Sequence, residues 1–341
     1  MKLTVLIITI LLALTLSKGA HAAEETDEAA SAHGAPVAAA QLATSEEGTP
    51  QHLTRNVSAE SDVVVSLYLG AGSIVVRGWD KKEVRARAGE VGRLELRRTG
   101  ATDGSRGARR VEVLVSNSED DEEMPAGEPG GTGHIELDVP RGATVNLKLR
   151  QGDVEISDVA EARVDSGNGD VDARRISRAA ELSCLSGSIY LRDSSGRVRL
   201  NAMSGDVEAV NVRAADEREE LIATSTSGDV RLEGIAHARV EGRTVSGSVR
   251  FIGRITDGGT YSLKTTSGDV TLAVPADSSF NVKALVVAGG EIITDFEVGA
   301  VEGTKKPITK LSKGLLAGRV GAGGAEVSLS SFSGTVYLRK R

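Results

Sequence analysis

The chain has 341 residues, of which 40 are glycine, 7 are proline and 1 is cysteine, and its formal net charge is −7 at pH 7. Its interspersed charges form no basic stripe, which argues against nucleic acid as a partner. The single cysteine excludes an intramolecular disulfide, and an aromatic content of 3% argues against the aromatic platforms of carbohydrate-active sites.

Residues 1–22 have the three-part order of a secretory signal peptide. A lysine precedes an apolar run from Leu3 to Leu16, and Ala20-His21-Ala22 forms a small-residue cleavage site. The run is shorter than the roughly 20 residues that span a bilayer. We therefore expect cleavage after residue 22, no transmembrane segment afterwards, and export to the periplasm, the cell surface or the extracellular medium. An uncleaved N-terminal anchor is the alternative.

Residues 23–52 form an acidic tail without lysine or arginine. A segment rich in alanine, glutamate and threonine cannot bury enough apolar surface to become ordered, so we expect a disordered tether. Its acidic residues are Glu24, Glu25, Asp27, Glu28, Glu46 and Glu47.

Residues 53–133 alternate apolar and polar residues as strands do, without a clean repeat. Gly72-Ser73-Ile74 is a degenerate first copy of a phrase that recurs further along, so we expect this irregular β segment to begin or cap a repeat array. Residues 117–133 are an acidic loop rich in proline and glycine. Clustered carboxylates suit calcium, but ligand spacing at alternate residues is absent, which favours a solvated loop.

Residues 134–341 carry the recurring phrase: glycine, then Asp, Ser or Thr, then Val or Ile, usually with serine before the glycine. From Gly152 to Gly268 successive glycines are 17 to 23 residues apart. A near-constant step of this size is typical of repeat architectures, in which each unit must stack on its neighbours. The phrase glycines are Gly152, Gly169, Gly187, Gly205, Gly228, Gly247, Gly268 and Gly334.

Each repeat predicts two strands joined by a tight turn at the glycine. Apolar residues stand two and four positions after it, with a polar residue between them, which is the period of a strand with one buried face. The glycine supplies a positive φ, and the Asp or Ser hydrogen-bonds the local backbone. Small residues stand three positions before the glycine, among them Cys184, which we interpret as a buried structural thiol. The fold class is therefore all-β, a β-solenoid with a less regular β N-terminal part.

At the C-terminal end, Gly289-Gly290 predicts another degenerate turn, residues 299–324 interrupt the repeat, and residues 325–341 close the array. On this interpretation Arg339-Lys340-Arg341 puts positive charge on an end strand, which discourages edge-to-edge aggregation.

Stacked turns would bring five aspartates together: Asp153, Asp170, Asp206, Asp229 and Asp269. A calcium ladder is one hypothesis, but the Gly-Gly-x-Gly-x-Asp nonapeptide of such ladders is absent, so a turn-stabilising role is favoured. Paired carboxylates for polysaccharide cleavage are another hypothesis. His134 and His237 form no zinc motif. We assign no catalytic, cofactor-binding or metal-binding residue and expect no cofactor.

The segments 226–232 and 266–275, which read TSGDVRL and TSGDVTLAVP, resemble the bacterial "putative adhesin" family. These are exported β-strand-repeat proteins, otherwise described as a domain of unknown function, and the likeness covers about residues 135–341. The resemblance implies a right-handed, single-stranded β-helix-like fold in the cell envelope and an adhesive or structural role. Some relatives are linked to envelope stress. No catalytic residues accompany the family.

The leading hypothesis is a non-enzymatic, exported cell-envelope protein with an adhesin-like or structural binding surface. Its partner would be an envelope protein, a glycan or a second copy of itself, bound through exposed residues such as Tyr190, Arg231, Arg250 and Thr271. An envelope-stress signalling or scaffold module is the first alternative. A polysaccharide-active β-helix enzyme is the second.

Overall fold

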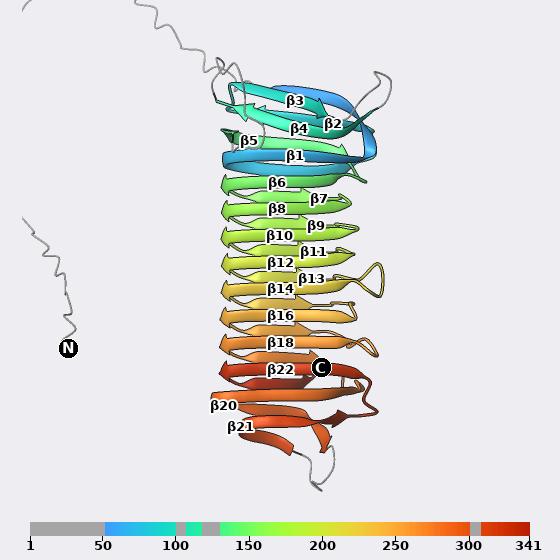
Figure 1. Cartoon of the computed structure of the whole chain (residues 1–341), viewed down its shortest axis with the longest axis vertical. Helices are drawn as coiled ribbons and strands as arrows, with labels where there is room; N and C mark the ends of the chain where they lie inside the picture. Colours follow the sequence, from blue (N-terminus) through green and yellow to red (C-terminus); the bar gives the residue numbers. More distant parts are fainter. Residues whose placement is uncertain (1–51, 100–106, 118–129, 301–307) are drawn as a thin grey trace, which may run out of the picture. The chain divides into compact units, whose positions relative to one another are not determined.

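A computed structural model describes residues 52–99, 107–117, 130–300 and 308–341. The predicted signal peptide at 1–22 and nearly all of the predicted tail at 23–52 lie outside these residues, as does most of the acidic loop. The described residues form one β-sheet of 23 strands that coils into a β-solenoid (Figure 1). They include no helix, and hence no helix that could cross a bilayer. The all-β solenoid predicted from the sequence is confirmed.

Each regular coil contains a long strand and a short strand, joined at the corner glycine. The long strands are β6 (Thr144–Gln151), β8 (Glu161–Asn168), β10 (Ala179–Ser186), β12 (Arg197–Ser204), β14 (Glu220–Ser227), β16 (Arg239–Ser246) and β18 (Thr260–Ser267). The short strands are β7 (Val154–Ser157), β9 (Val171–Arg174), β11 (Ile189–Arg192), β13 (Val207–Val210), β15 (Val230–Glu233), β17 (Val249–Ile252) and β19 (Val270–Val274).

Like strands pair in parallel with like strands of the neighbouring coils, so that equivalent residues stack. Leu182 pairs with Val164 on one side and with Leu200 on the other. The inward columns are buried and join into one hydrophobic cluster along the solenoid. Gly242 stands in the same inward column as Leu182 and Leu200. A Cβ there would meet Val249 and Leu263 at 3.0 and 3.2 Å, so neighbouring side chains already fill its place.

The corner glycines stack directly on one another, and this requires glycine. Gly205 has a φ of 138°, and an added Cβ would lie 2.1 Å from the carbonyl oxygen of Gly187. Its amide donates to the carbonyl of Ser227 in the following coil at 2.9 Å. The positive φ predicted for the phrase glycines is therefore confirmed. The contact between neighbouring corners adds a second reason for glycine.

The N-terminal segment both begins the solenoid and covers its end. It contains β1 (Leu53–Trp79), β2 (Glu83–Gly89), β3 (Arg93–Thr99), β4 (Ala108–Ser116) and β5 (Gly130–Pro140). Strand β1 is a complete coil that pairs in parallel with β6 and β7 on one edge and with β4 and β5 on the other. Strands β2 and β3 then pair antiparallel with β1, β5 and β4. Both roles expected for this segment are met, and β5 continues through the predicted boundary at 133/134.

The C-terminal end is ordered differently from the sequence prediction. Its strands are β20 (Phe280–Ala300), β21 (Ile308–Val320), β22 (Ala325–Ser333) and β23 (Val336–Lys340). Strands β22 and β23 lie between the β18/β19 coil and β20 (Figure 1). The prediction that Arg339-Lys340-Arg341 closes the array on an end strand is wrong, because β23 is paired on both edges. The antiparallel hairpin of β20 and β21 covers this end instead.

His237 lies wholly buried beside the solenoid corner that precedes β16. Its Nε2 donates to the carbonyl of Gly196 at 2.8 Å, and its own carbonyl accepts from the Tyr261 hydroxyl at 3.0 Å. Burial lowers the pKa of the His237 imidazole below its ordinary value, because desolvation disfavours the charged ring. The native structure therefore holds His237 neutral.

We expect Gly205→Ala to destabilise the protein by on the order of 3 kcal/mol or more, because a strained φ and a backbone collision add together. Gly258→Ala is the matched control, since Gly258 also has a positive φ, of 69°, but no atom lies within 4 Å of its added Cβ. That control should cost only about 1 to 2 kcal/mol. Urea unfolding measures both, and equal losses would contradict the stacking of the corners.

Stability should fall as the pH is lowered below about 6.5, the pKa of histidine in an unfolded chain. Below this pH His237 binds a proton in the unfolded state but not in the native state. Its contribution to the free energy of unfolding is therefore present at higher pH and is lost on acidification. The difference in unfolding midpoint between the wild type and His237→Gln, measured from pH 7.5 to 5, isolates the effect. A difference that does not change with pH would exclude it.

Candidate functional site

The aspartate column forms a hydrogen-bond ladder between coils. Asp153 Oδ1 accepts the amide of Asp170 at 2.8 Å, and Asp229 Oδ1 accepts the amide of Ser248 at 2.7 Å. Asp170, Asp206 and Asp269 make the equivalent bond to the next corner. The sequence placed these bonds within each turn, whereas the structure places them between turns. Among the residues that the structure describes, no cluster of His, Cys, Asp and Glu is arranged to hold a metal ion.

A second ladder comes from hydroxyl and thiol groups three positions before five of the corner glycines. The hydroxyl of Ser225 donates to the carbonyl of Gly205 at 2.9 Å. Thr244, Thr265 and Ser331 make the equivalent bond. Cys184 joins this ladder through its Sγ, 3.2 Å from the carbonyl of Gly169. Burial raises the pKa of the Cys184 thiol, so the residue is structural, as the sequence indicated, and is a poor nucleophile.

A second corner, six positions after each phrase glycine, escaped the sequence analysis. Asp158, Arg175, Asp193 and Asn211 stack there, each with a φ between 50° and 61°. These non-glycine residues in the left-handed region carry charge and amide groups toward solvent. The guanidinium of Arg175 donates two hydrogen bonds to Asp158, and this lowers the pKa of the Asp158 carboxyl. The corner is a stabilising network of ion pairs.

The exposed residues proposed from the sequence stand in one column on the short-strand face. Tyr190, Arg231, Arg250 and Thr271 occupy the same register position of β11, β15, β17 and β19. Some side chains of this column already contact neighbouring side chains of the protein, however. Arg192 packs over the Tyr190 ring at 5.2 Å, and Arg231 is bonded to Glu233 at 2.7 Å.

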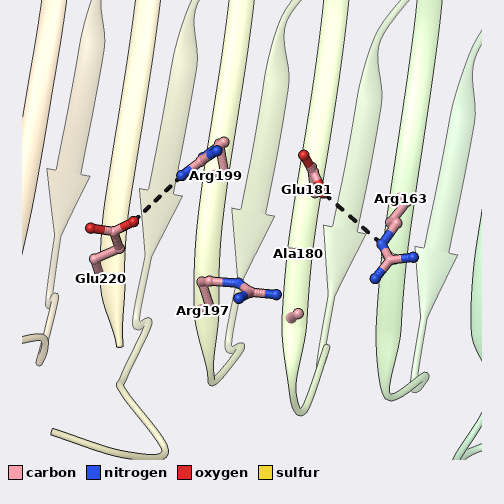
Figure 2. A pocket seen from close by; sticks show the side chains of 8 residues that line it. Arg163, Ala180, Glu181, Arg197, Arg199 and Glu220 are labelled. Carbon is pink, nitrogen blue, oxygen red and sulfur yellow. Dashed lines mark hydrogen bonds and ion pairs between the residues drawn. The ribbon is translucent and has the colours of Figure 1, made fainter. Parts of the chain in front are cut away.

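A hollow on the long-strand face is the arrangement best suited to hold a ligand. Its volume is about 300 Å³, and it opens above Ala179 because the adjacent positions of β8, β10, β12 and β14 carry long charged side chains. Figure 2 shows Arg163, Arg197 and Arg199 around it, together with Glu181 and Glu220. Sequence reasoning missed this hollow. The one signal was a small residue, Ala179, in a column otherwise made largely of charged side chains.

The hollow is lined by more arginine than glutamate side chains. Arg199 lies 3.4 Å from Glu220, and Arg163 lies 4.0 Å from Glu181 (Figure 2). The guanidinium of Arg197 forms no hydrogen bond or ion pair with any residue that the structure describes, although its backbone amide donates to the carbonyl of Arg178 at 3.0 Å. The hollow therefore presents one uncompensated guanidinium between two that are already paired. Such an arrangement can accept a carboxylate or phosphate group, which guanidinium binds through two parallel hydrogen bonds.

A protein-family model described as Toastrack DUF4097 matches residues 80–339. No curated protein matches the sequence. Similar solved structures include a "putative cell adhesion protein" from Clostridium sporogenes, with 12% identity over 86% of this chain and 100% of that one and a TM-score of 0.24. A "putative adhesin" from Parabacteroides merdae has 7% identity over 85% and 97% of the two chains and a TM-score of 0.39. Another from Bacteroides fragilis has 11% identity over 85% and 98%, with a TM-score of 0.28.

Removing one rung of the aspartate ladder should lower stability without involving a metal. We expect Asp229→Ala to cost about 1 kcal/mol, because it leaves the Ser248 amide without its acceptor. Asp229→Ser should cost less, since Ser188 occupies the equivalent position and its hydroxyl accepts the amide of Asp206 at 3.3 Å. Thermal unfolding with and without a calcium chelator tests both points, and a chelator-dependent midpoint would favour the calcium ladder.

Proposed function

The chain belongs to the Toastrack DUF4097 family, and we propose that it is a non-enzymatic, exported, adhesin-like protein that binds an acidic glycan of the cell envelope. The observation that carries this proposal is the uncompensated guanidinium of Arg197 in the hollow above Ala179. Export rests on the signal-peptide pattern of residues 1–22, with residues 23–52 as the tether of the mature protein.

The chemistry of the hollow supports a binding role. Its lining includes no hydroxyl, thiol or imidazole group. Both of its carboxylates, those of Glu181 and Glu220, are within 4.0 Å of an arginine. Both carboxylates are therefore engaged with arginine side chains of the same face, which suits a binding surface.

The shape of the surface supports an extended ligand. The long strands stack in register, so the face that carries the hollow continues from coil to coil without an intervening loop across the strands (Figure 1). A polymer can follow this face while one of its acidic groups enters the hollow. Exposed ion pairs contribute little individually, typically below about 1 kcal/mol, so the affinity should be modest and sensitive to salt.

We expect Arg197→Ala to reduce the affinity for an oligouronate by about tenfold, which corresponds to the loss of one charge-assisted contact of about 1.4 kcal/mol. Arg239→Ala is the matched control, because Arg239 lies in the same column two coils further on and outside the hollow. Calorimetric titration with oligouronate and with a neutral oligosaccharide of equal length measures the effect.

Equal losses in the two arginine variants would contradict binding in the hollow, as would equal affinity for the neutral oligosaccharide. A reducing-end assay on the same mixtures separates binding from cleavage. Release of new reducing ends by the wild type would overturn the non-enzymatic part of the proposal.

A further inference from the structure

Exposed apolar side chains stand on the long-strand face, two positions before four of the corner glycines. Leu185, Met203, Val245 and Phe332 expose between 47% and 57% of their surface, and Val287 on β20 continues the line. We call this column the apolar stripe. In spatial order its members are Leu185, Met203, Thr226, Val245, Thr266, Phe332 and Val287.

Five of the seven residues of the apolar stripe are apolar, and Thr226 and Thr266 stand among them. Neighbouring strands are about 4.8 Å apart, so the stripe is about 30 Å long. Exposed apolar residues of monomeric proteins are normally scattered singly, and contiguous patches mark interaction sites. A groove of about 470 Å³ lies along its first part, lined by Leu185, Met203 and Thr226 among others.

Near its middle, the apolar stripe has basic residues on one side and acidic residues on the other. On one side, four positions before the glycine, stand the exposed residues Arg243 and Lys264. Lys264 forms no ion pair with a described residue. On the other side, one position after the glycine, stand Asp206, Asp229 and Asp269, each of which uses Oδ1 in the corner ladder. Arg243 is bonded to Glu241 at 2.6 Å and its coil has Ser248 after the glycine, so the two flanks come level at Lys264 and Asp269.

We propose that the apolar stripe is the interface of a parallel, two-fold symmetric dimer of this chain. A two-fold axis parallel to the stripe places each stripe residue against its own equivalent. It also places the basic flank of one copy against the acidic flank of the other, with Lys264 level with Asp269. An axis across the stripe would instead bring basic flank against basic flank, so charge complementarity selects the parallel arrangement.

The size of the surface suits a reversible dimer. From four positions before the glycine to one position after it, at about 3.3 Å per residue, the surface is about 16 Å wide. A strip about 30 Å by 16 Å buries roughly 500 Å² on each copy, or about 1,000 Å² in total, which is in the range of weak, transient interfaces. Loss of the apolar contact should therefore abolish association.

Dimerisation and glycan binding can be tested separately. Arg197 stands six positions before Met203 on the same strand, about 20 Å from the stripe. A variant that fails to dimerise keeps its hollow intact, so failure of one proposal does not imply failure of the other.

Sedimentation velocity over a series of protein concentrations tests the interface. The wild type should show a concentration-dependent monomer–dimer equilibrium that weakens at high salt. The Met203→Glu/Phe332→Glu variant should remain a monomer throughout. Ile222→Glu is the control, because Ile222 lies on the same face but outside the stripe and its flanks. A wild type that stays monomeric, or a dimer that the double variant preserves, would overturn the proposal.

Disulfide trapping tests the orientation in a Cys184→Ser background. In the parallel dimer Met203→Cys and Phe332→Cys each meet their own equivalent, so each single variant should oxidise to a covalent dimer. An antiparallel dimer would cross-link only a mixture of the two variants, because it places Met203 against Phe332. Cross-linking in the mixture alone would overturn the parallel geometry, and no cross-linking in any sample would overturn the interface.

Discussion

The polar groups of the corner between the long and short strands find their hydrogen-bond partners in the corner of a neighbouring coil. The rest of the structure depends on this constraint. The amides of the corner glycines from Gly152 to Gly268, the carbonyls of five corner glycines and each aspartate at the turn find hydrogen-bond partners in a neighbouring coil. A single coil would leave these polar groups unpaired and its apolar columns exposed, so a coil is stable only within a stack. Small inward residues such as Cys184 also bond to the corner of the neighbouring coil.

Local patterns in the sequence predicted most of the solenoid. The alternation around each phrase identified the buried columns, and the glycines marked the first corner correctly. The order of the coils was not predictable in this way, because every coil presents the same backbone edge for pairing. Strand β18 therefore pairs with β22 and not with β20, the long strand that follows it in the sequence. The second corner was missed because Arg175, an unusual residue at positive φ, interrupts its Asp, Asn and Gly pattern.

The surface features were harder to predict from a single sequence than the fold. The hollow above Ala179 arises from side chains contributed by three other strands, about one repeat apart in the sequence. The apolar stripe is likewise visible only when Leu185, Met203, Val245 and Phe332 are brought side by side by stacking. Both features lie on the long-strand face, which places the proposed glycan site and the proposed dimer contact on separate columns of the same regular surface.

Residue-resolved hydrogen exchange of the corner amides tests the stacking most directly. Asp170 and Asp229 are exposed side chains in tight turns, positions whose amides ordinarily exchange quickly with solvent. If each amide is bonded to the preceding coil, both should exchange as slowly as the buried strand amides beside them. Rapid exchange at these two amides, with slow exchange in the adjacent strands, would contradict the ladder between coils.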